Sequence, residues 1–275
     1  MRLYKTRSGI VIEKEDKFYL STENWDTFIN DGDLLQKTQQ IITTLKEIDE
    51  GSIKELLPPI GNNQELWACG VTYLRSKVGR QEESKAAGGA DFYAKVYEAE
   101  RPEVFFKSTP HRIAGHNDFV RIRKDSTWDV PEPELTLLVA SSGKIIGYTI
   151  GNDMSSRSIE GENPLYLPQA KTYDRCAALG PCIYITDKPL DSNTTISLEI
   201  NRDEKKVFEG SIAINQIKRP FDELVSFVYR ECSFPNGCLI MTGTGIVPGN
   251  NFTLKSGDKI KITIDHIGEL VNTVQ

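Results

Sequence analysis

Short runs in which apolar side chains alternate with polar ones, or follow one another directly, recur along the chain after residue 65. Runs of roughly four to eight such residues are typical of β-strands. Most are separated by polar or Gly/Pro turns, and they occupy residues 66–71, 103–108, 118–124, 134–140, 144–151, 182–187, 195–201, 206–213, 238–243 and 259–265. Many short strands with few helices predict a mostly β fold, a sandwich or roll with some α elements.

The first sixty or so residues have a different pattern, which predicts a small α+β domain. Residues 9–21 read as two strands around the polar turn at Glu13 to Lys17, and residues 33–48 carry apolar side chains near helical spacing. Pro58 and Pro59 then interrupt regular structure. We therefore expect an N-terminal domain at residues 1–62 and a larger catalytic domain at residues 63–275.

Three further segments interrupt the run of strands. Residues 220–232 predict a helix, with Pro220 near its first turn and apolar residues on one stripe. The polar segments Arg75–Pro102 and Asn152–Arg175 are too long for turns, so we expect lids, binding loops or disorder there. Gly88 and Gly89 would let the first of them hinge.

Composition narrows the class of protein. The chain has 275 residues, of which 39% are hydrophobic and 26% charged, with a formal net charge of −6. A general nucleic-acid binder would need a basic surface, so we expect no nucleic-acid partner. The sequence has no apolar run of membrane-span length and no signal-peptide pattern. Its five cysteines form no CxxC pair, which favours reduced thiols and a cytoplasmic location.

The segment "DVPEPELTLLVA" carries the first candidate chemistry. In a strand, residues two apart point to the same face, so Glu132 and Glu134 stand side by side while Leu135 and Leu137 face the other way. Like charges in this position repel unless a cation lies between them. Taken alone, a solvated surface with two unremarkable glutamates is the more common arrangement.

The next strand adds a third carboxylate. A turn at Ser142 and Gly143 predicts that residues 144–151 return antiparallel, which brings Asn152 and Asp153 close to Glu132 and Glu134. Three carboxylates without His or Cys suit a hard divalent cation, with Mg²⁺ expected and Mn²⁺ or Ca²⁺ as substitutes.

Several segments resemble the fumarylacetoacetate hydrolase superfamily in order and spacing over roughly residues 65–275. They are "ELWACGVTY", "FFKSTP", "VPEPELTLLV", "GYTIGNDMSSR", "AKTYDRCAALGP", "MTGTGIVPG" and "FTLKSGDKIKITIDHIGELVNTV". Within the superfamily, "GNDMSSRSIEGENPLYLPQAKTYDRCAALGP" is most similar to the 2-keto-3-deoxy-D-arabinonate (2-keto-3-deoxy-D-xylonate) dehydratases. The resemblance implies a mixed β-roll and a homodimer or homotetramer. It also implies a Mg²⁺ site at the same three carboxylates, Glu132, Glu134 and Asp153.

One departure from the family separates two enzyme classes. Its hydrolases carry a histidine three residues after the tyrosine of a G-x-x-Y motif, whereas here Gly70 and Tyr73 are followed by Ser76. The missing base argues against hydrolysis of an acylpyruvate or fumarylpyruvate. That hydrolysis, or a related decarboxylation or isomerisation at the same metal, is the alternative function. It favours Mg²⁺-dependent dehydration of a 2-keto-3-deoxy sugar acid to 2,5-dioxopentanoate. A catalytically idle metal-binding or ligand-binding protein remains a second alternative.

Two residues are candidates for proton transfer, and the resemblance implies the first of them. Lys171 is the lysine of the family's G/A-K-S/T-F/Y-D motif. A lysine beside a cation would have a lowered pKa and could act as a base. The alternative is a surface lysine in a polar loop. Glu103 is the other candidate acid or base, or else an exposed residue at a strand start.

Lys171 and four further residues are candidates for contacts with the 2-keto acid substrate, and one of the four, Ser76, is also a candidate catalytic residue. Arg75 and Ser76 would meet it if the segment that they begin closes, and the competing view is an ordinary mobile loop. Gly243 and Thr244 lie in "TGTG", where backbone amides and a hydroxyl could hold the substrate carboxylate; the alternative is a plain glycine turn.

Overall fold

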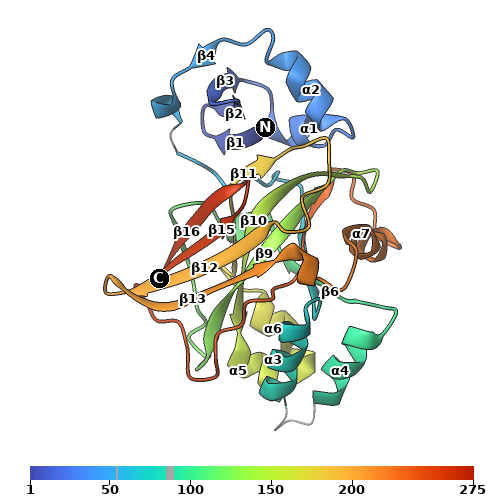
Figure 1. Cartoon of the computed structure of the whole chain (residues 1–275), viewed down its shortest axis with the longest axis vertical. Coiled ribbons are helices and arrows are strands. Elements are labelled where there is room, and N and C mark those ends of the chain that lie inside the picture. Colours follow the sequence, from blue (N-terminus) through green and yellow to red (C-terminus); the bar gives the residue numbers. More distant parts are fainter. Residues whose placement is uncertain (54, 85–89) are drawn as a thin grey trace.

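The structure is a computed structural model that describes residues 1–53, 55–84 and 90–275. Within these ranges the chain is mostly β, as the hydrophobic pattern predicts, and its strands form two sheets (Figure 1). Each of the ten predicted strand segments contains a strand. The run at residues 118–124 is a strand only over its first three residues, and the run at 182–187 belongs to a strand that starts at Ala177.

The larger sheet is mixed and runs through the molecule from the N-terminal unit to the strand at Glu103–Ser108. Its strand order is β4-β3-β2-β1-β11-β10-β9-β14-β5-β6, and β7 pairs with β11 outside this path. The strands are β1 (Arg2–Thr6), β2 (Gly9–Lys14), β3 (Lys17–Ser21), β4 (Glu47–Ile48), β5 (Leu66–Gly70), β6 (Glu103–Ser108), β7 (Ile113–Ala114), β9 (Asp129–Val139), β10 (Ile145–Ser156), β11 (Ala177–Tyr184) and β14 (Cys238–Met241).

A second sheet of five described strands packs on one face of the first. Its order is β13-β12-β15-β16-β8. The strands are β8 (Asp118–Val120), β12 (Thr195–Arg202), β13 (Lys205–Ala213), β15 (Lys259–Ile264) and β16 (Gly268–Val274). Alternate residues of β12 and β15 are buried between the sheets, which explains the period of two in their sequences.

Strand β9 is buried along its whole length because both of its faces are covered. Leu135, Leu137 and Val139 pack in the core between the two sheets. Leu138 points the other way, into a core that it shares with the N-terminal unit through Phe28 and other residues. This central position is what removes the polar residues of β9 from water.

The N-terminal unit adds strands to the larger sheet. β1 pairs antiparallel with β11, and helices α1 (Trp25–Ile29) and α2 (Leu34–Ile41) pack beside β1–β3 (Figure 1). The predicted hairpin is present, as β2 and β3, and so is the predicted helix, as α2. The sequence pattern missed β1. The boundary at residue 62 stays a prediction, and the structure shows continuous hydrogen bonding between β1 and β11 across it.

Both long polar segments contain helices, which the sequence did not predict. The first holds α3 (Leu74–Ser84) and α4 (Ala90–Glu98); the second holds α5 (Arg157–Glu162) and α6 (Leu167–Lys171). Apart from glycine, α3 carries only Leu74 and Val78 as apolar residues, so no periodicity revealed it. The proposed hinge at Gly88 and Gly89 lies outside the described residues. The predicted helix near residue 220 is α7 (Phe221–Tyr229).

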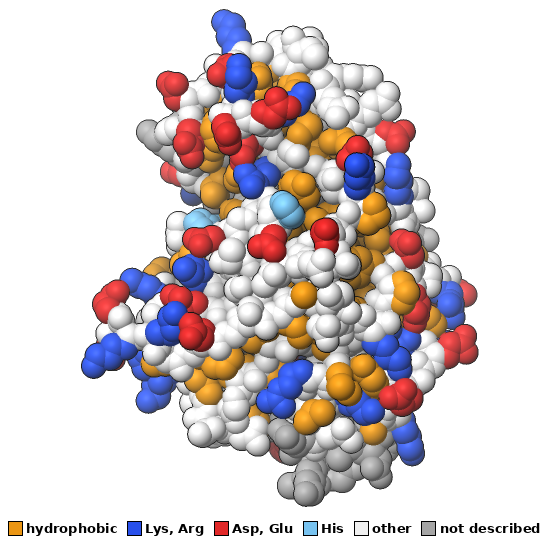
Figure 2. All heavy atoms as spheres, in the orientation of Figure 1, with side chains coloured by type: hydrophobic (Ala, Val, Ile, Leu, Met, Phe, Trp, Pro, Cys, Tyr) orange, Lys and Arg blue, Asp and Glu red, His pale blue; other side chains and the backbone are white. Residues whose placement is uncertain are grey.

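Helices α3, α5 and α6 gather at the end of the large sheet where β9 begins and β10 ends (Figure 1). The remaining described helices are the 3₁₀ turns η1 (Glu50–Ser52), η2 (Pro110–Arg112), η3 (Pro164–Tyr166) and η4 (Ile214–Gln216). None of the helices in the described ranges is long and apolar enough to cross a membrane. On the face shown in Figure 2, acidic and basic side chains are interspersed.

Candidate active site

Strands β9 and β10 bring three carboxylates together. The two strands are antiparallel, with Asp153 opposite Glu132 and Gly151 opposite Glu134. Residues directly opposite each other, and residues two apart on one strand, share a face of the sheet. One oxygen from each of Glu132, Glu134 and Asp153 accordingly lies within 4.8 Å of the others. The convergence expected from the sequence is present.

These carboxylates are buried, so the alternative of a solvated surface is wrong. Glu132 is 5% exposed, Glu134 2% and Asp153 1%. Burial raises the pKa of Glu134 well above its usual range, and the charges of Asp153 and Glu132 raise it further. Burial also raises the pKa of Glu132, although Lys171 partly offsets it. Holding both groups ionised here costs free energy unless a further cation is present.

The donor set fits a hard divalent cation. All three ligands are carboxylate oxygens, and two oxygens on opposite sides of Mg²⁺ would be about 4.2 Å apart. The observed spread of 4.8 Å is close to that value. Glu132 and Asp153 each have a cationic partner, whereas Glu134 forms no ion pair with any described residue. Of the three clustered carboxylates, Glu134 is therefore the one without an ion pair to a described residue.

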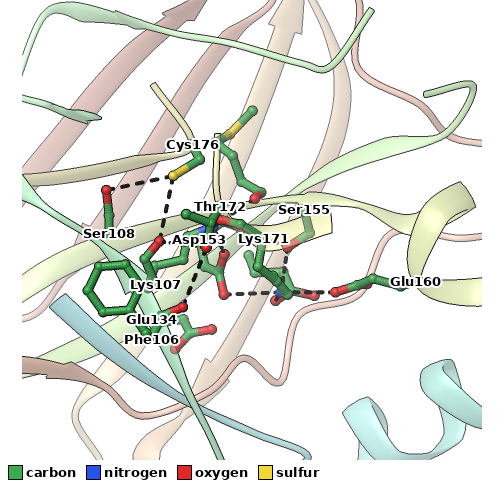
Figure 3. A network of polar contacts seen from close by, with 12 residues as sticks. Phe106, Lys107, Ser108, Glu134, Asp153, Ser155, Glu160, Lys171, Thr172 and Cys176 are labelled. Atoms are coloured by element: carbon green, nitrogen blue, oxygen red, sulfur yellow. Dashed lines mark hydrogen bonds and ion pairs between the residues drawn. The ribbon is translucent and has the colours of Figure 1, made fainter. Parts of the chain in front are cut away.

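Lys171, the last residue of α6, lies in the middle of the cluster (Figure 3). Its Nζ donates to Glu132 Oε2 at 2.5 Å, to Asp153 Oδ2 at 3.0 Å and to Ser155 Oγ at 2.6 Å. The side chain is fully buried, so the alternative of a surface lysine is wrong. Burial would lower the pKa of Lys171, but the surrounding carboxylates outweigh it and raise the pKa. The lowered pKa expected from the sequence refers to a lysine beside a bound cation, and it stays a prediction.

Lys107 is a second buried lysine at the site, and sequence reasoning did not assign it a role. Its Nζ lies 2.5 Å from Asp153 Oδ1 and donates to the backbone carbonyls of Met154, at 3.0 Å, and of Lys171 (Figure 3). It thereby ties β6 to β10 and to the end of α6. A signal was present, because Lys107 alternates with Glu103 and Phe105 along β6 and so shares the face that bears Glu103.

Arg157 and Glu160, on the short helix α5, were also missed. Arg157 Nη2 donates to Glu132 Oε1 at 2.7 Å. Glu160 pairs with Lys171 Nζ at 3.4 Å and with Nη1 of Arg80, on α3, at 3.0 Å. Burial would raise the pKa of Glu160, but Arg80, Lys171 and Arg157 outweigh it and lower the pKa to about 2. Five carboxylates and four cationic side chains thus share one water-poor region when Glu103 is included.

Glu103, the first residue of β6, folds its carboxylate over the neighbouring strand β5. It is paired with Gly70, and a Cβ at Gly70 would lie 1.8 Å from Glu103 Oε2. That oxygen is buried and has no hydrogen-bond partner among the described residues. Burial raises the pKa of Glu103. The alternative of an exposed residue at a strand start is wrong for the carboxylate of Glu103. Its buried surroundings favour the protonated form.

Ser76 and Arg75 lie in the first turn of α3. The Ser76 hydroxyl donates to the Tyr73 carbonyl at 2.7 Å and accepts from the Tyr73 amide at 3.2 Å, so it caps the helix start. Arg75 is exposed and lines a cavity of about 340 Å³ together with Tyr73 and Ile212. Substrate contact by Ser76 or Arg75 stays a prediction.

The "TGTG" turn contacts Glu134, one of the three clustered carboxylates. The Gly243 amide donates to Glu134 Oε2 at 2.6 Å and so fixes the orientation of that carboxylate. Gly243 has a φ of +94°, and a Cβ there would lie 2.1 Å from Thr72 Oγ1, so only glycine fits. The Thr244 hydroxyl accepts from the Ile246 amide at 3.2 Å. Binding of a substrate carboxylate by Gly243 and Thr244 stays a prediction.

Comparison with known proteins agrees with this geometry. The profile of the fumarylacetoacetate (FAA) hydrolase C-terminal family matches residues 74–275. A probable 2-keto-3-deoxyxylonate dehydratase of Haloferax volcanii is 49% identical over 212 residues, which cover 77% of this chain and 72% of that protein. The 2-dehydro-3-deoxy-D-arabinonate dehydratase of Saccharolobus solfataricus is 41% identical over 239 residues, which cover 86% and 78%.

Solved structures are similar over the whole length of the chain. One is a 2-keto-3-deoxy-D-arabinonate dehydratase in complex with magnesium and 2,5-dioxopentanoate. It superimposes with a TM-score of 0.85 at 33% sequence identity and covers 100% of this chain and 99% of its own. The similarity includes the N-terminal unit, which the family profile leaves out.

Proposed function

The chain belongs to the fumarylacetoacetate hydrolase C-terminal family, and from this membership and the site geometry we propose that it is a Mg²⁺-dependent dehydratase of 2-keto-3-deoxy sugar acids. The substrate that the relatives favour is 2-keto-3-deoxy-D-arabinonate, the same compound as 2-keto-3-deoxy-D-xylonate, and the product is 2,5-dioxopentanoate. The observation that carries the proposal is the buried trio Glu132, Glu134 and Asp153 beside Lys171.

Glu132, Glu134 and Asp153 would hold the metal. When bound there, Mg²⁺ would act as a Lewis acid on the 2-keto acid end of the substrate, which makes the C3 protons more acidic. The Gly243 amide, Arg157 and Lys107 each contact one of the three carboxylates and keep it in place. The chain therefore supplies both the ligands and the groups that orient them.

Two residues are placed to move protons. We assign Lys171 to the C3 proton, because its Nζ lies among the ligand carboxylates where the 2-keto acid would bind. We assign Glu103 to the C4 hydroxyl, because burial raises its pKa and a protonated carboxyl can donate to a leaving hydroxyl. Removal of one C3 proton and of the C4 hydroxyl as water forms a C3–C4 double bond. Loss of a C5 proton and return of a proton to C3 then give the C4–C5 enol, which tautomerises to the C5 aldehyde of 2,5-dioxopentanoate.

Hydrolysis is the weaker alternative at the same site. An acylpyruvate or fumarylpyruvate hydrolase needs a base for water, and the position of the family histidine holds Ser76, whose hydroxyl is engaged in the first turn of α3. The sequence from Arg75 to Pro102 contains no histidine. Dehydration needs no activated water, which favours it.

A substrate panel with and without EDTA tests the proposal. Purified protein with Mg²⁺ should convert 2-keto-3-deoxy-D-arabinonate to 2,5-dioxopentanoate, and EDTA should stop the reaction until Mg²⁺ is restored. Release of pyruvate from an acylpyruvate would favour the hydrolase instead. Failure to convert any 2-keto-3-deoxy acid in the presence of Mg²⁺ would leave a metal-binding protein without this activity.

We further propose that the enzyme works as a homodimer or homotetramer in the cytoplasm. Large apolar side chains are exposed on the single chain, with Leu165 83% and Phe119 53% exposed, which supports contact with a second copy. The described cysteines are all free, which supports a reducing compartment. Light scattering after size-exclusion chromatography measures the assembly, and a monomeric mass would contradict it.

A further inference from the structure

Glu160 is a buried carboxylate to which the proposed reaction gives no role. It is 1% exposed and lies on α5, next to the metal-binding carboxylates but apart from them. Arg80 and Lys171 pair with its Oε1 at 3.0 and 3.4 Å, whereas its Oε2 has an ion pair with Arg157 at 3.9 Å and accepts no hydrogen bond from a described residue. Buried carboxylate oxygens that accept no hydrogen bond are rare, so a missing donor is the expected explanation.

The position of Glu160 indicates which donor is missing. It meets Lys171 from the side opposite Asp153, so Lys171 lies between Glu160 and the metal-binding carboxylates (Figure 3). Glu160 also acts electrostatically on Glu103, whose Oε2 is another buried carboxylate oxygen that accepts no hydrogen bond from a described residue. A substrate whose 2-keto acid end lies at Glu132, Glu134 and Asp153 would extend past Lys171 toward Glu103 and Glu160.

Glu103 and Glu160 differ in what they can do for a hydroxyl. Burial raises the pKa of Glu103, which suits it to protonate the hydroxyl that leaves. The pKa of Glu160 is about 2, lowered by Arg80, Lys171 and Arg157 in spite of burial, so this group stays ionised and can only accept a hydrogen bond. An acceptor of this kind suits a hydroxyl that remains on the substrate.

We propose that Glu160 is the residue that selects hydroxylated substrates, by accepting a hydrogen bond from the hydroxyl on C5, one carbon beyond the hydroxyl that leaves. This inference rests on the proposed dehydratase function. A site built around a buried acceptor discriminates strongly against an analogue that lacks the matching hydroxyl, because the acceptor then stays unsatisfied. The enzyme should accordingly favour 2-keto-3-deoxy acids with a hydroxyl at C5 over the corresponding 5-deoxy compounds.

The test compares two compounds in each variant. 2-Keto-3-deoxy-D-arabinonate carries hydroxyls at C4 and C5, whereas 4-hydroxy-2-oxopentanoate keeps the leaving hydroxyl and lacks the one at C5. We expect the wild-type kcat/KM ratio of the two to include a factor of about 10 to 100 from one hydrogen bond to a charged acceptor. Glu160→Gln keeps the shape and a neutral acceptor and should lower the ratio by about 5- to 10-fold; Glu160→Met should lower it further.

The ratio separates recognition from a structural role. If Glu160 only positions Lys171 or holds α3 through Arg80, both compounds lose kcat/KM equally and the ratio stays within twofold of wild type, which would overturn the inference. Glu162→Gln removes the same charge from an exposed position on the same helix and should leave the ratio unchanged. Thermal unfolding and calorimetric Mg²⁺ titration of each variant show whether the fold and the metal site are intact. If Glu160→Met does not fold, the kcat/KM ratio of Glu160→Gln alone tests the inference.

Failure of the inference is distinguishable from failure of the proposed function. If the wild-type protein with Mg²⁺ converts both compounds with equal kcat/KM, the dehydratase stands and the role of Glu160 is wrong. If it converts neither compound, the proposed function itself fails.

Discussion

Charged side chains pair with one another in two very different settings in this molecule. At the end of β9 and β10, Lys171 and Lys107 hold Asp153 and Glu132 in a region where each side chain is no more than 6% exposed. On the outer sheet, Lys259 pairs with Glu204 at 3.2 Å while their side chains are 56% and 88% exposed. Both are ion pairs at similar distances, but only the first lies out of reach of water.

The two settings differ in what the charges cost in free energy of folding. Exposed pairs contribute about 0–1 kcal/mol to the free energy of unfolding, and they are dispensable. Buried charges must be taken out of water, and apolar side chains of similar volume are often at least as stable in their place. A fold that keeps five carboxylates buried together at one end of its large sheet is therefore arranged for chemistry, and the substitutions below should affect the two settings differently.

Lys171→Met should have the largest effect, because it leaves Glu132 and Asp153 buried with one positive partner fewer. We expect the free energy of unfolding to fall by about 3–5 kcal/mol. Turnover should fall by about 10²- to 10⁴-fold through loss of the proton-transferring group. Urea denaturation and kcat measure the two effects. Lys188→Met, at an exposed position, is the matched control and should change neither.

Glu134→Gln should separate activity from stability. Burial and the charges of Asp153 and Glu132 raise the pKa of Glu134, so its ionised form is disfavoured in the folded protein and a neutral amide relieves this at neutral pH. We expect the metal-free variant to unfold at a higher temperature than metal-free wild type, while Mg²⁺ affinity and turnover fall by about 100-fold or more. Calorimetry of unfolding and of Mg²⁺ binding measures both. A variant that is less stable and still binds Mg²⁺ would contradict this reading of the cluster.

Asp129→Asn should have a smaller effect that depends on pH. Burial raises the pKa of Asp129, at the start of β9, to about 6. The folded protein therefore binds this proton more tightly than the unfolded chain does. The stability that the bound proton contributes to the wild-type protein is lost as pH rises from about 4 to 6. The asparagine variant has no such loss. Its unfolding temperature should equal that of wild type near pH 3.5 and exceed it by about 2–4 °C above pH 6.5, and an equal difference at both pH values would contradict the account.

Lys259→Ala should have the smallest effect of all. Its ion pair with Glu204 is exposed and screened, so the free energy of unfolding should change by no more than about 0.5 kcal/mol and turnover should not change. Urea denaturation in low and high salt measures this. A loss comparable to that of Lys171→Met would remove the distinction between the two settings.

The sequence predicted the parts of the site that depend on local geometry. Glu132 and Glu134 share a face because strands alternate, and Asp153 joins them because a turn at Ser142 and Gly143 sets the return of β10. These relations act within about twenty residues of chain. The family resemblance supplied Lys171, which the pattern alone could not place, whereas Glu103 was a candidate from its place on the strand at residues 103–108.

The remaining partners depend on distant contacts that no local pattern encodes. Lys107 reaches Asp153 although β9, β14 and β5 lie between β6 and β10 in the strand order, and Glu160 reaches Arg80 because α5 packs against α3. The helices α3 and α5 lie in segments too polar for hydrophobic periodicity to reveal. The same reason explains why β1 was missed, since its pairing with β11 joins residues far apart in the sequence.

The central claim is that one divalent cation binds the oxygens of Glu132, Glu134 and Asp153. The most direct test is anomalous diffraction from crystals of the wild-type protein grown with Mn²⁺ in place of Mg²⁺, with Glu134→Gln crystals as the control. The account predicts one strong peak in contact with all three carboxylates, lost or strongly weakened in the variant. A peak elsewhere, or none, together with turnover that persists in EDTA, would contradict it.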